Sequence, residues 1–218
     1  AKTPLAWPLS WLFAAKLKQG LNKITSIDDL QQQVKSYVKQ MLATTSKGLE
    51  VTGLERLDKN TSYLFISNHR DIAMDPALVN YALYTQGYNT VRIAIGDNLL
   101  RKDYVSDLMR LNKSFIVQRS AKGPRQKLAA FNLLSRYIQH SLKADNQSIW
   151  IAQKEGRAKD GYDSTEAAII KMFAMAQRKD LPFNEIIAQL NLVPVAISYE
   201  FDPLAVEKAN ELVELATK

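Results

Sequence analysis

The 218-residue sequence contains no cysteine and only two histidines, His69 and His140. The lack of cysteine excludes disulfides, thiolate metal ligands and a cysteine nucleophile. Because the two histidines are far apart in the sequence, we predict no metal site. No stretch reaches the roughly 20 apolar residues that a membrane-spanning helix needs. The G-x-S-x-G motif of serine hydrolases is also missing, so any catalysis has to use other side chains.

Acidic residues are outnumbered, with 22 Asp and Glu against 29 Lys and Arg, which gives a formal net charge of +7. A positive surface attracts phosphates, anionic lipid headgroups or nucleic acid, and excess lysine can also simply solvate a surface. The basic residues do not alternate with aromatic residues on a strand, and no zinc or helix-turn-helix signature occurs. We therefore expect no nucleic-acid partner and an anionic membrane surface as a partner.

The N-terminal segment over residues 3 to 15, TPLAWPLSWLFAA, is uncharged, carries two tryptophans and runs into Lys16 and Lys18. Such a pattern suits a helix lying in the headgroup region of a bilayer. The alternatives are a segment that packs on its own domain or the remnant of a removed signal. We expect an N-terminal helical segment over residues 1 to 47 and an α/β domain over residues 48 to 218, unless the two pack as one domain.

Strand-like and helix-like segments alternate along the rest of the chain. Strands are expected at residues 49–51, 63–66, 91–96, 114–118, 148–152 and 192–199. Helices are expected at residues 26–41, 76–84, 97–111 and 125–142, after Asp163 to Glu166, and after Asp202-Pro203. This alternation predicts the α/β class, with a mixed, largely parallel central sheet flanked by helices.

Three expected strands run directly into polar loops, at residues 67–71, 118–123 and 153–161. In open α/β sheets, ligands bind beyond the carboxyl ends of the strands. If the strands are near-parallel, these three loops share one rim of the sheet. We therefore expect the functional site at that rim.

His69 follows a buried strand and is followed by Asp71 and Asp75. A carboxylate can hold one imidazole nitrogen while the other takes a proton, which is the arrangement of a general base. Asp75 precedes Pro76, so it could simply be a helix N-cap, although a carboxylate at a helix start also stays ionised. Asp71 could instead cap a turn of the loop. Asp75 is the favoured partner of the ring, and Asp71 remains the alternative.

Four segments resemble, in order, the conserved motifs of the glycerophospholipid acyltransferases, the lysophosphatidic acid and glycerol-3-phosphate acyltransferase group. These segments are FISNHRDIAMDP (65–76), SFIVQRS (114–120), KEGRAKDG (154–161) and LVPVAIS (192–198). The resemblance covers roughly residues 50 to 200. The sequence departs from the family pattern in two places. The spacer between His69 and Asp75 has one residue more than is usual in the family. The Thr or Gly that usually follows Glu-Gly is missing, so Arg157 directly follows Gly156.

The resemblance implies an O-acyltransferase that moves a fatty acyl group to a hydroxyl of glycerol phosphate or a lysophospholipid. The donor would be a thioester of coenzyme A or of acyl carrier protein, used as a co-substrate, with no tightly bound cofactor. The protein would sit peripherally on the cytoplasmic face of a membrane. The alternative is a non-catalytic protein on the same fold that binds anionic lipids.

The same resemblance assigns roles to individual residues. His69 would be the base, oriented by Asp75 or Asp71, and Arg119 would bind the phosphate of the acceptor. The remaining acceptor-binding candidates are Asn68, Arg70, Glu155, Gly156 and Arg157. Lys122 and Arg125, in the basic run after Arg119, could bind the phosphates of coenzyme A. His140 lies within an expected helix and is interpreted as structural or exposed.

Overall fold

The computed structural model describes residues 25–100, 107, 109 and 112–217. The chain divides into two compact units, residues 1–49 and 50–218, which are described separately. The first contains helix α2 (Ile27–Thr45), longer than the expected 26–41. It begins with a capping box in which Ser26 and Asp29 satisfy each other's backbone N–H groups. No helix among the described residues is long and apolar enough to cross a membrane. The tryptophan-bearing residues 3–15 lie outside the described residues.

The second unit is built on a parallel sheet, which confirms the predicted α/β class. Its strands are β1 (Leu64–Ser67), β2 (Arg92–Gly96), β3 (Ser114–Val117), β4 (Ile149–Ala152) and β5 (Leu192–Val195). Their spatial order is β3-β2-β4-β1-β5, and every pairing between them is parallel. The carboxyl ends of all five strands therefore meet at one edge.

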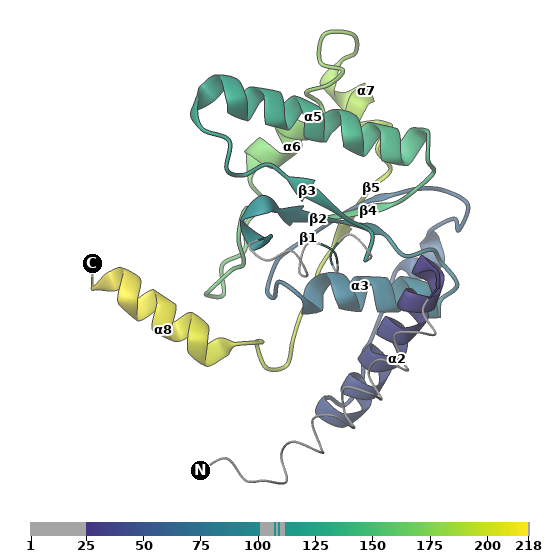
Figure 1. Cartoon of the computed structure of the whole chain (residues 1–218), viewed down its shortest axis with the longest axis vertical. Coiled ribbons are helices and arrows are strands. Elements are labelled where there is room, and N and C mark those ends of the chain that lie inside the picture. Colours follow the sequence, from purple (N-terminus) through teal and green to yellow (C-terminus); the bar gives the residue numbers. More distant parts are fainter. Residues whose placement is uncertain (1–24, 101–106, 108, 110–111, 218) are drawn as a thin grey trace. The chain divides into compact units, whose positions relative to one another are not determined.

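Helices cover both faces of this sheet (Figure 1). On one face lie α5 (Gly123–Lys143) and α6 (Ala167–Phe173), and on the other lies α3 (Met74–Thr85). Successive strand residues point to opposite faces. Leu64 and Ile66 accordingly join the core beneath α5, whereas Phe65 joins the core beneath α3. Both faces are buried, which explains why the strands are continuous apolar runs.

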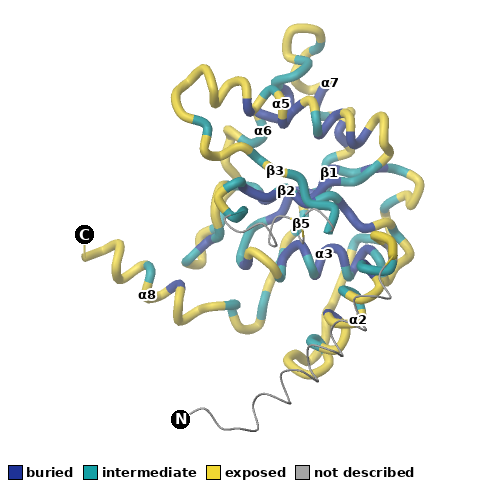
Figure 2. Tube along the Cα trace, viewed as in Figure 1, coloured by how far each residue is buried: buried dark blue, intermediate teal, exposed yellow. Residues whose placement is uncertain are grey.

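Two further helices complete the domain. Helix α7 (Phe183–Ala188) lies between α6 and β5, and the sequence analysis did not foresee it. Helix α8 (Ala205–Ala216) follows β5 and extends away from the sheet (Figure 1), with much of its surface exposed (Figure 2). Short 3-10 helices lie at Leu54–Arg56 and Asp97–Leu99.

Some expected elements differ in the structure. Residues 49–51 form no strand, because they pair with no neighbouring strand and are exposed. Strand β5 stops at Val195 rather than at residue 199, since the side-chain amide of Asn68 takes both the N–H and the carbonyl of Ile197. The helix expected at residues 97–111 starts as a 3-10 turn, and most of the rest of it lies outside the described residues.

Helix α3 begins two residues earlier than expected, and this changes the role of Asp75. Its N-cap position is Ala73, so Asp75 and Pro76 lie within the first turn. The N-cap interpretation of Asp75 is therefore wrong. Its carboxylate points back toward the loop that precedes the helix.

Candidate active site

A cavity of about 610 Å³ lies at the rim where the strands end. It contains the predicted residues His69, Arg119, Glu155, Gly156 and Arg157, which come from the first, second and third polar loops. Apolar side chains from the sheet and from α5 and α6 complete the lining, among them Ile93, Val117, Phe131, Leu134, Ile151 and Met172. The structure thus brings together the three polar loops that were expected to share one rim if the strands are near-parallel.

The His69 ring is held by Asp75. The ring Nδ1 lies 2.8 Å from Asp75 Oδ2, and the Asp75 side chain is completely buried while that of His69 is 12% exposed. The ionised carboxylate accepts the Nδ1–H, which fixes the tautomer. The second ring nitrogen, Nε2, has no hydrogen-bond partner among the described residues, and His69 lines the cavity. This leaves Nε2 as the nitrogen able to take up a proton.

The Asp75 carboxylate is fully hydrogen-bonded despite its burial. Besides the ring, Oδ2 accepts the backbone N–H groups of Arg70 (2.6 Å) and Asp71 (3.0 Å), and Oδ1 accepts the Tyr199 hydroxyl (2.7 Å). Burial by itself raises the pKa of Asp75, but the hydrogen bonds from His69, Tyr199, Asp71 and Arg70 outweigh it and lower the pKa below its ordinary value. Asp75 is therefore an anion at neutral pH.

Asp71 has a different task. Its Oδ1 accepts the backbone N–H groups of Ala73 (2.9 Å) and Met74 (2.8 Å), and so it satisfies the free donors at the start of α3. This side-chain turn also accommodates the extra residue of the spacer, because it folds the chain back so that Asp75 still reaches the ring. Asp75, and not Asp71, contacts His69.

The backbone of His69 is fixed by the third loop and by Asp163, which follows it. The His69 N–H donates to Asp163 Oδ2 (3.0 Å), and its carbonyl accepts the Ala158 N–H (2.7 Å). Trp150 of β4 presents its ring to the imidazole at 5.8 Å between ring centres, at an angle of 69°. Because both backbone groups and the ring are held, the imidazole has little freedom to turn.

Two predicted acceptor-binding residues use their polar groups within the protein. Asn68 bonds to Ile197 through both its amide oxygen and its amide nitrogen. The Arg70 guanidinium donates to the Asp202 carboxylate and to the Asp160 carbonyl. Neither residue lines the cavity. A substrate-binding role for them stays a prediction, and the contacts seen are those of residues that shape the loops.

Arg119 reaches the cavity through a gap left by a glycine. A Cβ placed on Gly96 would lie 2.7 Å from Arg119 Cδ and 2.3 Å from Asn98 Oδ1, closer than carbon atoms approach in proteins. Asp97 accepts the backbone N–H groups of Arg119 (3.2 Å) and Ser120 (3.1 Å), so the end of β2 positions the second loop. The Arg119 guanidinium lies 3.9 Å from the exposed Glu155 carboxylate.

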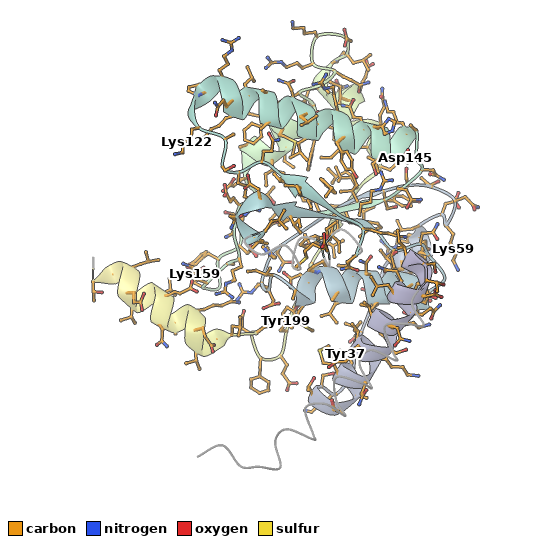
Figure 3. All side chains as sticks on the ribbon, in the orientation of Figure 1. Tyr37, Lys59, Lys122, Asp145, Lys159 and Tyr199 are labelled. Carbon is orange, nitrogen blue, oxygen red and sulfur yellow. The ribbon has the colours of Figure 1, made fainter. Side chains whose placement is uncertain are left out.

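Of the remaining predicted residues, Gly156 and Arg157 line the cavity, whereas the others are exposed outside it. Arg157 donates to Glu211 of α8 at 2.8 Å, and Gly156 adopts a φ of 77°, which favours glycine. Lys122 and Arg125 are exposed near the first turn of α5, where Figure 3 labels Lys122, and they do not line the cavity. His140 is exposed on the same helix, 3.4 Å from Asp145.

Tyr199, near the start of α3 in Figure 3, is a residue of the site that the sequence analysis missed. Burial, the hydrogen bond to Asp75 and the nearby carboxylates of Asp75, Asp71 and Asp202 raise the pKa of Tyr199, so it remains a hydrogen-bond donor. The one sequence feature that pointed to Tyr199 as a site residue was its position at the end of the last predicted strand. That signal becomes informative once β5 is known to lie beside β1.

The Tyr199→Phe substitution tests this contact. It leaves Asp75 Oδ1 buried without its donor, which costs about 1 to 3 kcal/mol of unfolding free energy. Chemical denaturation at neutral pH measures the loss. Tyr37→Phe, at an exposed tyrosine, is the control and should be neutral. Equal stability of Tyr199→Phe and Tyr37→Phe would contradict the contact.

The lowered pKa of Asp75 predicts a pH dependence of stability. The unfolded-state pKa of aspartate is about 3.9. Since the folded value is lower, the stabilisation is fully present above the unfolded value and is lost as the pH falls through the folded value. Asp75→Asn should therefore lose less stability than the wild type between pH 5 and acid pH, as followed by denaturation at several pH values. Asp180→Asn, at an exposed aspartate, should retain the wild-type dependence.

The match to a protein-family model agrees with the motifs. A family model described as Acyltransferase matches residues 48–198. Among solved structures, the crystal structure of the 1-acyl-sn-glycerophosphate (LPA) acyltransferase from Thermotoga maritima aligns with a TM-score of 0.49 and 13% sequence identity. That alignment covers 69% of this chain and 55% of the Thermotoga chain, so this chain spans about half of that protein's length. No curated protein sequence gives a significant match. The family model covers most of the chain, and the chain belongs to the acyltransferase family.

Proposed function

We propose that the protein transfers a fatty acyl group from a thioester to a hydroxyl of a glycerol phosphate or lysophospholipid, with His69 as general base. One observation carries the proposal: the His69 ring, held by the buried Asp75 anion, faces a cavity that also contains the Arg119 guanidinium. A base and a cation in one cavity suit an acceptor that carries both a hydroxyl and a phosphate.

The proposed chemistry uses no covalent enzyme intermediate. His69 Nε2 takes the proton of the acceptor hydroxyl as its oxygen attacks the thioester carbonyl, and Asp75 stabilises the imidazolium that forms. The tetrahedral intermediate then collapses with cleavage of the carbon–sulfur bond. The departing thiolate receives the proton from the imidazolium, so the ester, the free thiol and neutral His69 are the products.

The lining of the cavity supports two substrate regions. Among the described residues, the one ion pair of the Arg119 guanidinium is a 3.9 Å contact with an exposed carboxylate, so its planar fork is available for two hydrogen bonds to a phosphate. The apolar side chains from the sheet, α5 and α6 suit an acyl chain. We propose a coenzyme A or acyl carrier protein thioester as donor, with the exposed Lys122 and Arg125 as candidates to attract its phosphates.

A lipid acceptor requires contact with a bilayer. We propose that the protein works peripherally at the cytoplasmic face of an anionic membrane. The net charge of +7 supports this proposal. The N-terminal segment of residues 3–15 remains the predicted site of attachment.

Replacement of the base tests the mechanism. In assays with an acyl thioester and lysophosphatidic acid, His69→Ala should lower the rate of transfer by about 10²- to 10⁴-fold, because general-base catalysis contributes that factor. His140→Ala replaces the other histidine, which is exposed on α5, and should keep the wild-type rate. Undiminished turnover by correctly folded His69→Ala would falsify the mechanism. Vesicle binding without transfer to any acceptor would favour the non-catalytic lipid-binding alternative.

Replacement of Arg119 tests the phosphate site. Loss of a charge-assisted hydrogen bond costs about 1.5 to 3 kcal/mol, so Arg119→Ala should raise KM for a phosphate-bearing acceptor by about 10- to 100-fold. Arg136→Ala, at an exposed arginine of α5, is the control and should leave KM unchanged. Steady-state kinetics with acceptor as the varied substrate provides the measurement. A KM for Arg119→Ala equal to that of the control would rule out the assigned role.

A further inference from the structure

A carboxylate from α8 is bound by two cations that line the cavity. Glu211 Oε1 lies 2.8 Å from Arg157 Nη2, and Glu211 Oε2 lies 2.9 Å from Lys159 Nζ. Arg157 and Lys159 both belong to the third loop, and both line the cavity that contains His69. In Figure 3, Lys159 lies between the body of the domain and α8. Each oxygen of Glu211 is thus matched to one positive group.

The position of Glu211 is set by a buried anchor one helical turn earlier. Lys208, whose side chain is 2% exposed, donates from Nζ to the Arg70 carbonyl (2.7 Å) and to the Asp202 carboxylate. Asp202 also accepts from the Arg70 guanidinium. Residues three apart lie on the same side of a helix, so the anchor that attaches α8 to the His69 loop also directs Glu211 to the third loop.

Glu211 presents the same chemistry to these cations as a phosphate would. Arginine and lysine bind carboxylate and phosphate oxygens with charge-assisted hydrogen bonds of the same kind. The hydrogen bonds from Lys159 and Arg157 lower the pKa of Glu211, so it is charged at neutral pH. Its side chain is 39% exposed, and ion pairs open to water are weak. A phosphate with two negative charges can therefore compete with it.

We propose that Glu211 is a specificity-determining residue that competes with the phosphate of the acceptor for Arg157 and Lys159. The inference rests on the proposed function, because the phosphate that competes with Glu211 is taken to be that of the acyl acceptor. Arg119, whose one ion pair among the described residues is the 3.9 Å contact with Glu155, binds the phosphate first. Release of Glu211 then frees two further cations at the same cavity. The competition lowers the affinity of the site for simple phosphates and sets KM for the acceptor.

The Glu211→Gln substitution tests the proposal, with inorganic phosphate as the probe. The substitution removes the charge while keeping the length of the side chain. Isothermal titration should show about 2- to 30-fold tighter phosphate binding, the range expected from releasing two solvent-accessible ion pairs. Glu214→Gln, at an exposed glutamate of the same helix, is the control and should bind phosphate as the wild type does. Unchanged or weaker binding by Glu211→Gln would overturn the proposal. Glu211 would then have the structural role of attaching α8 to the third loop.

A double mutant separates local competition from a general effect of charge. In an Arg157→Ala background, Glu211→Gln should keep only the part of its gain in phosphate affinity that comes from releasing Lys159, because its interaction with Arg157 is already absent. An unreduced gain would contradict competition at Arg157. Thermal unfolding of each variant checks that α8 remains attached through Lys208.

The outcome is distinguishable from failure of the proposed function. Phosphate titration needs no turnover, so an inactive His69→Ala protein should show the same gain on Glu211→Gln. If the acyltransferase proposal fails, this gain still reports on the anion site. In the active enzyme, Glu211→Gln should lower KM for a phosphate-bearing acceptor by the same factor. An unchanged KM would overturn the assignment of the anion as acceptor phosphate.

Discussion

The contact between the buried Asp75 carboxylate and the His69 ring is the interaction on which the rest of the site depends. A buried anion is costly unless every lone pair is satisfied, and four donors surround this one. Three of the donors belong to consecutive residues of one loop, and the fourth is Tyr199. The need to satisfy Asp75 therefore determines both the path of the loop and the direction of the imidazole.

The parallel sheet supplies the second constraint. Since all strands run the same way, loops that are distant in sequence end at the same rim. Strand β4 lies between β1 and β2, so its loop is adjacent to the His69 loop and bonds to it through Ala158 and Asp163. Arg119 follows β3, and its side chain packs against Gly96, where a Cβ would collide with it. The cavity follows from strand order and from one missing side chain.

The sequence was sufficient for the class of fold, the strand ends and the pairing of His69 with a nearby carboxylate, because these depend on local pattern. It favoured Asp75 but misjudged its position in the helix, since the turn made by Asp71 depends on backbone geometry. Tyr199, Lys208 and Glu211 could not be identified from the sequence. Their partners lie in other loops, and the sequence around a tyrosine or a charged helix residue does not predict which loop it contacts.

The central claim is that Asp75, through His69, sets the rate of acyl transfer. Single-turnover transfer by Asp75→Asn and Asp71→Asn tests it most directly. An asparagine at position 75 can donate to Nδ1 and so favour the wrong tautomer, whereas one at position 71 can still accept the two N–H groups of its turn. We predict a loss of about 10²- to 10⁴-fold for Asp75→Asn and a rate near that of the wild type for Asp71→Asn. Equal rates for the two folded variants would contradict the claim.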